Sequence, residues 1–231
     1  RVRLIWLTEK LSGKPITTIT TDELLTIRKE LLTTRAPATA NRFLAIVSAV
    51  LNYAHSKSQL AAVPKIPYLP EPKDRFRWLT RPQAIALIAE LPEHLAAMTR
   101  FALATGLRRA NVTGMTWHNI DVERKIAWVW PDEAKAGKPI AVPLNADALE
   151  VIRKQQEKNQ RDARYVFTYR KKPVLRTTTK AWVLALERAA IDPGFTFHDL
   201  RHTWASWHVM GGTPLEVLRQ LGGWADMTMV L

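Results

Sequence analysis

Cysteine is absent from the 231 residues of this chain. Its absence excludes disulfide bonds, a thiol nucleophile and cysteine-type zinc sites, and it is typical of a cytoplasmic protein. No run of about 18 apolar residues is present, so the sequence predicts no transmembrane helix. No stretch resembles a signal peptide, and because the sequence begins with Arg1 we expect further residues to precede it.

Acidic residues are scarce relative to basic ones, with 21 Asp and Glu against 34 Lys and Arg. Residues 1–73 carry 11 basic and 5 acidic residues, and residues 74–231 carry 23 and 16. Both halves are therefore basic, as expected if both contact the same polyanion, with ordinary solubility charge as the alternative. No basic amphipathic helix dominates, so the charge does not indicate a membrane surface.

The first 66 residues predict a small bundle of helices. Apolar residues recur at helical spacing over 2–11, over about 21–33 and over 38–51. Thr20 and Glu23 have the spacing of a capping box at the start of the second helix. The polar face of the third helix offers Asn41, Arg42 and Ser48, and we expect Asn41 and Arg42 to contact the polyanion.

A proline-rich stretch follows, with four prolines between Val63 and Lys73. Proline lacks the amide donor and fixes φ, so this stretch fits neither a helix nor a central strand. It predicts a semi-rigid linker over 67–75, which separates domain 1–66 from domain 76–231.

The second domain is predicted to be mostly helical with a small sheet near its start. Thr80 caps one helix, and Thr105-Gly106 ends another that spans 95–104. Apolar residues then alternate over 126–130 and again over 140–144, which indicates two paired strands. The hairpin turn between them carries Lys135 and Lys138. The fold class is therefore mainly α with a small antiparallel β-sheet, divided into two domains.

The last 34 residues contain two helical patterns, each ended by a pair of glycines. A helical period runs from Leu200 to Met210, and Gly211-Gly212 ends it. Thr213-Pro214 predicts the start of a second short helix, with Thr213 as N-cap, and Gly222-Gly223 ends that helix just before Trp224. His198 and Arg201 are three residues apart, so one helical face can present both.

Several basic residues lie at these helix ends and in the hairpin turn, and together they suit the binding of a phosphodiester. An arginine fork can hold two phosphate oxygens, and two such forks can stabilise a pentacovalent phosphorus. A lysine on a hairpin can protonate a leaving oxygen, and a histidine can move a proton near neutral pH. An indole N–H can donate to a non-bridging oxygen. The residues with these properties are Arg108, Lys135, His198, Arg201 and Trp224.

At these residues the chain resembles the tyrosine recombinases, the phage integrase family. The stretches that carry the resemblance are ATGLRRANVTGMTW at 104–117, KAGKPIAVPL at 135–144, HDLRHTWAS at 198–206 and LGGW at 221–224. It covers residues 76–231 strongly, whereas residues 1–66 resemble the helical core-binding domain of these enzymes with weaker motif support.

The resemblance implies a role for each matching residue. Arg108 takes the place of the first catalytic arginine, and His198 and Arg201 match the second box. Lys135 matches the lysine that acts as general acid on the 5′ oxygen, with Lys138 as its rival. Trp224 stands where the family has histidine or tryptophan. We expect Arg109 and Lys138 to contact DNA phosphates or to lie in solvent. His202 is a further candidate DNA contact, with local packing or hydrogen bonding as its alternative.

Two positions depart from the family pattern. Asn111 stands where an acidic residue often braces the first arginine. The nucleophilic tyrosine is expected about nine residues after Trp224, at position 233, and the sequence ends at Leu231. We therefore expect these 231 residues to bind DNA without cleaving it.

The resemblance further implies a site-specific DNA recombinase that cuts and rejoins DNA through a 3′-phosphotyrosyl link. It implies no metal, nucleotide or other small-molecule cofactor, double-stranded DNA at attachment or core sites as partner, and four protomers on two duplexes. A bacterial or phage-encoded cytoplasmic protein, nucleoid-associated when bound, is the expected setting.

Two other interpretations remain open at this point. A non-catalytic DNA-binding regulator could use the same fold, although binding alone does not require the complete set of five site residues. A metal hydrolase could use His198 and His202, which are spaced like helical metal ligands, but the intervening Arg201 disfavours a cation site.

Overall fold

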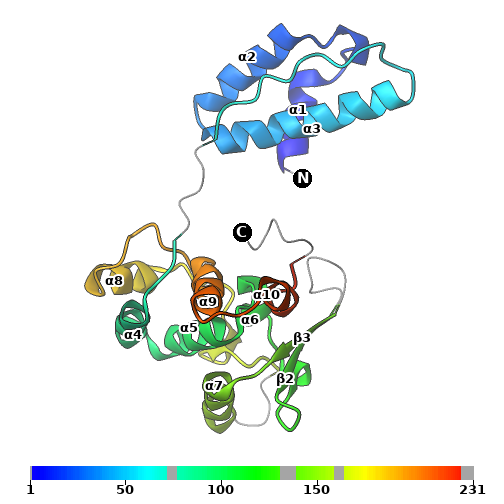
Figure 1. The fold of residues 1–231 in the computed structure, drawn as a ribbon. Helices are drawn as coiled ribbons and strands as arrows, with labels where there is room; N and C mark the ends of the chain where they lie inside the picture. Colours follow the sequence, from blue (N-terminus) through cyan, green and yellow to red (C-terminus); the bar gives the residue numbers. More distant parts are fainter. Residues whose placement is uncertain (1, 72–76, 131–138, 159–163, 225–231) are drawn as a thin grey trace. The chain divides into compact units, whose positions relative to one another are not determined.

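The computed structural model describes residues 2–71, 77–130, 139–158 and 164–224. The chain forms two compact units, Arg1–Asp74 and Arg75–Leu231 (Figure 1). Each unit has its own hydrophobic core.

The described part of unit 1 is helical. Its elements are α1 (Val2–Leu11), the short 3₁₀ helix η1 (Ile16–Thr18), α2 (Thr21–Leu32) and α3 (Pro37–Ser56). The predicted cap of α2 is confirmed, since the Thr20 side chain accepts a hydrogen bond from the amide of Glu23. α3 is longer than its predicted range of 38–51, and Phe43, Val47 and Leu51 lie on its buried face. Both α1 and α2 pack their apolar residues against that face.

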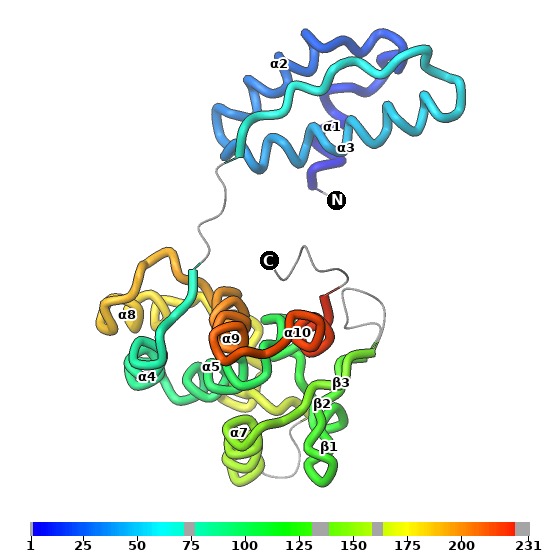
Figure 2. The backbone as a smooth tube through the Cα atoms, in the orientation of Figure 1, coloured from blue at the N-terminus to red at the C-terminus, as the bar shows by residue number. Residues whose placement is uncertain are grey.

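The proline-rich segment does not run free of unit 1. Its apolar side chains Val63, Ile66 and Leu69 pack against the core of the three helices. Polar side chains of α2 also hold its backbone, with Thr21 donating to the carbonyl of Lys65 and Arg28 to that of Pro67. The segment follows the helices in the tube view (Figure 2). The division between the units falls between Asp74 and Arg75, within the predicted linker 67–75.

Unit 2 contains a bundle of helices and a small sheet. Its helices are α4 (Arg81–Glu90), α5 (Glu93–Thr105), α6 (Arg109–Thr113), η2 (Trp117–Asn119), α7 (Ala146–Lys158), α8 (Lys180–Arg188), α9 (Asp199–Met210) and α10 (Leu215–Gly222). Its strands are β1 (Ile120–Asp121), β2 (Ile126–Val129), β3 (Ile140–Pro143), β4 (Thr168–Tyr169) and β5 (Lys172–Pro173).

The predicted pair of antiparallel strands is confirmed. β2 pairs with β3 so that Val129 lies opposite Ile140, and the short β1 extends the sheet on the other side of β2. β4 and β5 form a separate two-stranded hairpin. Ala127, Val129 and Val142 face the core, whereas Trp128 lies on the other face of the sheet. The predicted turn with Lys135 and Lys138 lies outside the described residues.

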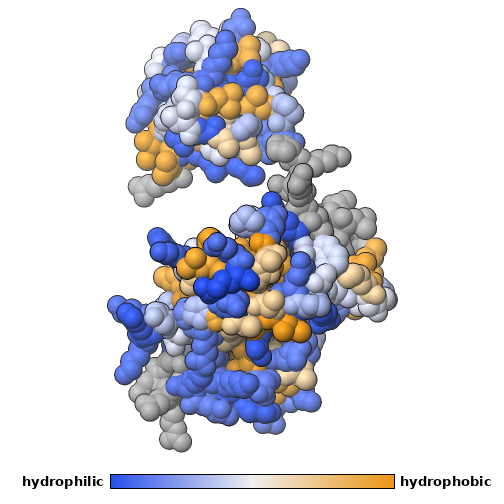
Figure 3. Space-filling model, turned by 90° about the vertical axis from the view of Figure 1, so that its left-hand side faces the viewer, coloured by the Kyte–Doolittle hydropathy of each residue, from blue (hydrophilic) through white to orange (hydrophobic). Residues whose placement is uncertain are grey.

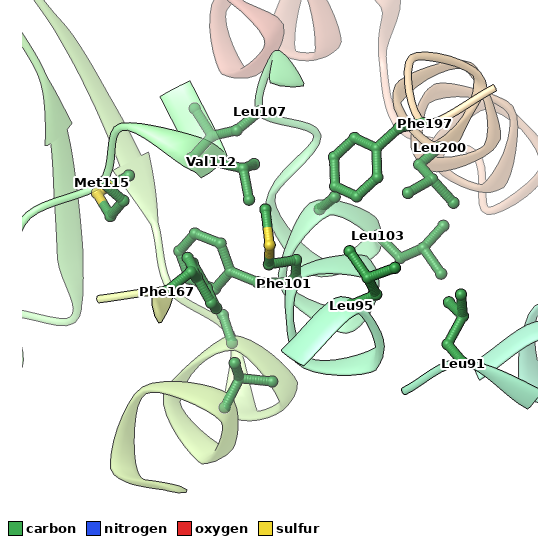
Figure 4. Packing of buried hydrophobic residues seen from close by; sticks show 14 of the residues in the cluster. Leu91, Leu95, Phe101, Leu103, Leu107, Val112, Met115, Phe167, Phe197 and Leu200 are labelled. Carbon is green, nitrogen blue, oxygen red and sulfur yellow. The ribbon is translucent and has the colours of Figure 1, made fainter. Parts of the chain in front are cut away.

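Helix α5 is the centre of unit 2, because α7 and α9 pack along it and α4 and α6 contact it as well. Figure 4 shows Leu95, Phe101 and Leu103 of α5 amid side chains from other parts of the unit. These include Val112 of α6, Leu200 of α9, and Phe167 and Phe197 from connecting segments. All of these side chains are buried. This packing fixes the end of α5 relative to the start of α9, and both ends carry predicted site residues.

One face, shown in Figure 3, is dominated by hydrophilic residues with smaller hydrophobic groups between them. Within the described residues, no helix is long and apolar enough to span a membrane.

Candidate active site

Arg108 follows a sharp turn at the end of α5. Gly106 caps that helix with φ of 64°, a left-handed conformation that favours glycine, as its position after Thr105 predicts. The next residue, Leu107, is buried in the core. Arg108 itself has an extended backbone and is the N-cap residue of α6. Its side chain is partly buried and donates from Nη2 to the carbonyl of Gly223 at 3.4 Å.

Arg201 comes from the first turn of α9 and is only 5% exposed. Its Nη1 donates to the carbonyl of Gly106 at 2.7 Å, and its Nη2 donates to the carbonyl of Gly222. Its Cζ lies 4.3 Å from the centre of the Trp224 ring, within range of a cation–π interaction. The guanidinium is thus held by two backbone carbonyls and one aromatic face.

The end of α10 supplies much of this framework. Gly223 has φ of 59° and caps the helix, so the carbonyls of Gly222 and Gly223 are left for other donors. The C-terminal end of a helix carries partial negative charge, which favours the two cations. A Cβ built on Gly222 would overlap the Trp224 ring, so only glycine lets the indole lie there.

The start of α10 differs from its prediction by one residue. Pro214 is the N-cap and Leu215 begins the helix, whereas Thr213 was predicted as the cap. The hydroxyl of Thr213 lies 3.0 Å from Nδ1 of His208 instead, so this side chain is used at the end of α9.

The two arginines place two positive charges close together. Burial, followed by the charge of Arg108, lowers the pKa of Arg201 to about 9, which leaves it charged at neutral pH. Burial also lowers the pKa of Arg108. Neither guanidinium forms an ion pair with a carboxylate among the described residues. An anion bound between them would offset the repulsion, so the geometry suits a phosphate group.

His198 lies beside this arginine pair, immediately before the first residue of α9. Partial burial lowers its pKa most, followed by the charges of His202 and Arg201. Asp199 acts in the opposite direction, and Arg108 lowers the pKa least. The His198 ring meets that of His202 edge-on at 5.3 Å. A neutral imidazole at pH 7 can accept a proton from a nucleophile.

The loop before α9 fixes where His198 is placed. The Asp199 carboxylate accepts hydrogen bonds from the amide of Thr196 at 2.6 Å and from its hydroxyl at 2.8 Å. Phe195 and Phe197 are buried in the core on the same loop. The loop is therefore anchored on both sides of His198.

Four of the five predicted catalytic residues are thus brought together: Arg108, His198, Arg201 and Trp224. The fifth, Lys135, and its rival Lys138 lie outside the described residues. Of the predicted DNA contacts in this unit, Arg109 is exposed at the start of α6, and His202 is partly buried next to His198.

The two predicted DNA contacts of unit 1 differ in their surroundings. Asn41 is 8% exposed and holds the proline-rich segment: its amide nitrogen donates to the carbonyl of Leu69 and to Glu71, and its oxygen accepts from the amide of Leu69. Its hydrogen-bonding groups are therefore engaged within the fold. Arg42, next in sequence, is exposed.

Sequence reasoning did not identify two residues that shape the site. Gly106 supplies a carbonyl to Arg201, and its sequence signal was only that of a helix end. Trp204 is buried against Gly106, and the sequence motifs assigned it no role at the site. The described residues contain no group of three or more His, Asp or Glu that could hold a metal ion.

Known proteins share much of this sequence. Residues 77–231 match the phage integrase family. The chain is 40% identical over 209 residues to the integrase of Salmonella phage P22, covering 84% of this chain and 53% of that protein. It is 30% identical over 139 residues to tyrosine recombinase XerC 2 of Ralstonia nicotianae, covering 57% of this chain and 39% of that protein. The chain thus spans about half of the length of the P22 integrase and less than half of that of XerC 2.

Solved structures share the fold. The Tn1549 transposon integrase, in complex with a circular intermediate DNA, has a TM-score of 0.81 at 17% identity, covering 100% of this chain and 86% of that one. A lambda integrase tetramer bound to a Holliday junction has a TM-score of 0.74 at 19% identity, covering 99% and 68%. Together with the family match over most of the chain, these similarities show that the protein belongs to the tyrosine recombinases of the phage integrase family.

Proposed function

We propose that this chain is the DNA-binding and phosphate-activating part of a site-specific recombinase. One observation carries the proposal: Arg108 and Arg201 lie together, held by backbone carbonyls and without a carboxylate partner among the described residues. A site built for structural stability would pair such charges, because unpaired buried charges are unfavourable. A site built for a phosphodiester leaves them to the substrate.

Each site residue has a role in that reaction. The two arginines would hold the non-bridging oxygens and stabilise the pentacovalent phosphorus. His198 would take the proton of the attacking hydroxyl, and the indole N–H of Trp224 would donate to a phosphate oxygen. Lys135 would protonate the leaving 5′ oxygen, as the resemblance implies. A tyrosine expected at position 233 would form the 3′-phosphotyrosyl link, and a 5′ hydroxyl of a partner strand would reverse it.

We infer that unit 1 acts as the core-binding domain. Its charge supports this role, because the excess of basic over acidic residues in 1–73 is close to that in 74–231. The exposed Arg42 is the proposed contact on α3, whereas the engaged side chain of Asn41 makes it a poor one. Four copies on two duplexes would perform the exchange, by analogy with the lambda integrase tetramer.

The experiment that tests the function compares two lengths of chain. A protein of these 231 residues is expected to bind duplex DNA but to form no covalent protein–DNA adduct. The longer protein from the source gene is expected to form the adduct and exchange strands. In that protein Arg201→Ala should abolish strand transfer while weakening DNA binding by about 1–3 kcal/mol, as expected for the loss of one charged contact.

A non-catalytic DNA-binding regulator predicts a different result. The longer wild-type protein would then bind DNA without forming an adduct on any substrate. An adduct formed by the 231-residue chain would contradict the assignment of the nucleophile to position 233.

A further inference from the structure

Trp204 lies between two of the groups that hold Arg201. On one side its indole packs so closely on Gly106 that a Cβ built there would overlap the ring. On the other side its ring centre is 6.0 Å from that of Trp224, at an interplanar angle of 33°. Trp204 is 4% exposed and belongs to a small cluster with Ala205 and Leu218, against which Leu221 and Trp224 pack.

Both neighbours of the Trp204 indole contact the Arg201 guanidinium directly. The Gly106 carbonyl accepts from Nη1 of Arg201, and the Trp224 ring lies below its Cζ. The third contact, from Nη2 to the carbonyl of Gly222, comes from the residue on which Trp224 packs. The three contacts thus come from two segments more than a hundred residues apart in sequence.

We infer that Trp204 is a positioning residue for Arg201: the indole acts as a spacer that sets the separation between Gly106 and the end of α10. This role rests on the proposed function for its purpose, because the held guanidinium would grip the scissile phosphate. Trp204 itself lies in the framework around Arg201, and its own indole nitrogen is not needed for the role.

The surroundings make the size of this side chain important. Trp204 also lines a cavity of about 690 Å³ between α4, α5, α7 and α9. A smaller side chain at this position would enlarge the cavity, because no neighbouring side chain on that side is packed closely enough to fill the space. Gly106 and Trp224 could then shift toward each other, and the arginine would lose the fixed distance between its acceptors.

The same helix offers a matched control. Trp207 also lines the cavity, but its Nε1 donates to the carbonyl of Leu79 at 2.8 Å, and Arg81 covers its ring. It contacts neither Gly106 nor Trp224 in any described interaction. Trp207→Phe therefore removes an indole from α9 without touching the framework of Arg201.

The first test needs no DNA. In an NMR spectrum of the ¹⁵N-labelled chain, the Arg201 guanidinium is expected to give separate, slowly exchanging Nη–H signals, because both Nη atoms donate to carbonyls. Loss of these signals in Arg201→Lys assigns them. Trp204→Ala should merge or broaden them, Trp204→Phe should shift them part of the way, and Trp207→Phe should leave them in place.

The second test asks whether Trp204 acts through Arg201. Trp204→Ala should weaken DNA binding about threefold to tenfold in the wild-type background and have little effect in an Arg201→Ala background. A residue that merely stabilises the fold would give the same factor in both backgrounds. Should Trp204→Ala fail to fold in circular dichroism, Trp204→Phe carries both tests.

The two tests separate this inference from the proposed function. Arg201 signals that stay unchanged in position and linewidth in the folded Trp204 variants overturn the positioning role, whatever the DNA affinity. An equal effect of the substitution in both backgrounds overturns it as well. Failure of the wild-type chain to bind DNA would contradict the proposed function, while the NMR result would still decide the role of Trp204.

Discussion

Arg108 and Arg201 donate to the carbonyls of consecutive residues, Gly223 and Gly222, at the end of α10. The two guanidiniums lie 93 residues apart in sequence and repel each other, since the charge of Arg108 adds to burial in lowering the pKa of Arg201. The negative end of the α10 dipole offsets part of this repulsion. A bound phosphate would offset the rest, so the site is best satisfied when occupied.

The first prediction is that Arg108→Met separates stability from binding. Arg108 makes one long hydrogen bond, and its charge opposes that of Arg201. Removing it should keep the free energy of unfolding constant or raise it by about 1 kcal/mol, as at other functional sites that trade stability for activity. DNA affinity should fall about tenfold or more. Chemical denaturation and a duplex-binding titration measure the two effects.

Arg109→Met is the control for that variant. Arg109 is exposed and begins α6, so its removal should leave the unfolding free energy within about 0.5 kcal/mol of the wild type. A clear loss of stability in Arg108→Met, with Arg109→Met unchanged, would show that Arg108 has a structural partner and is not held ready for an anion.

The second prediction concerns the pH dependence of DNA binding. The pKa of His198 lies below its ordinary value of 6.5 in the free protein because of partial burial and neighbouring cations. A phosphate in the site would raise that pKa, so the complex takes up a proton that the free protein does not. DNA affinity should therefore rise as the pH falls below 6.5, and this rise should be smaller in His198→Gln.

The same shift predicts the opposite trend for stability. A cationic group with a lowered pKa in the folded state is protonated more readily in the unfolded chain. The free energy of unfolding should thus decrease as the pH falls from 6.5 through the folded pKa of His198. His94 and His208 also have lowered pKa values, so the test is the difference between wild type and His198→Gln. Identical pH profiles for the two proteins would contradict this account.

The third prediction concerns the close approach of Gly106 to Trp204. Gly106→Ala would place a Cβ into the indole and a side chain at φ of 64°. It should lower the free energy of unfolding by about 3 kcal/mol or more. Gly212→Ala is the control, because φ there is 79° and a Cβ would meet nothing within 4 Å. It should cost only about 1–2 kcal/mol. Equal losses would indicate that Trp204 yields easily to the added methyl.

The fourth prediction compares two adjacent residues of α3. Asn41→Ala removes three hydrogen bonds to the proline-rich segment and should destabilise unit 1 by about 1–3 kcal/mol. Hydrogen exchange at the Leu69 amide measures this directly. Arg42→Ala should leave that exchange unchanged but reduce DNA affinity. Faster exchange of the Leu69 amide in Arg42→Ala, or an unchanged exchange rate in Asn41→Ala, would contradict the assigned roles.

Local signals in the sequence predicted most of the helices and the main sheet. The Thr20 and Thr80 caps and the glycine after Thr105 determine helix ends through bonds within a few residues, so they can be read from the sequence. Alternation over 126–130 and 140–144 predicted the pairing of β2 with β3 for the same reason.

Features that depend on distant contacts could not be predicted in this way. The proline-rich stretch packs on unit 1 because Asn41, Arg28 and Thr21 bind its backbone from helices more than 25 residues away. Asn41 was predicted to be available for DNA because its hydrogen-bond partners, Leu69 and Glu71, are distant in sequence. The site residues could be found through their motifs. The acceptors that hold Arg201 are backbone carbonyls, which every residue has, so the sequence does not indicate which of them are used.

The most direct test of the arginine pair as a phosphate grip is the salt dependence of DNA binding. The slope of log affinity against log salt reports the phosphates that a protein neutralises, at about 0.9 per phosphate on duplex DNA. For the 231-residue chain and its Arg108→Met/Arg201→Met double variant, we predict a slope smaller by about one in the variant. An unchanged slope and affinity in a folded double variant would contradict the central claim, because the two arginines would then contact no phosphate.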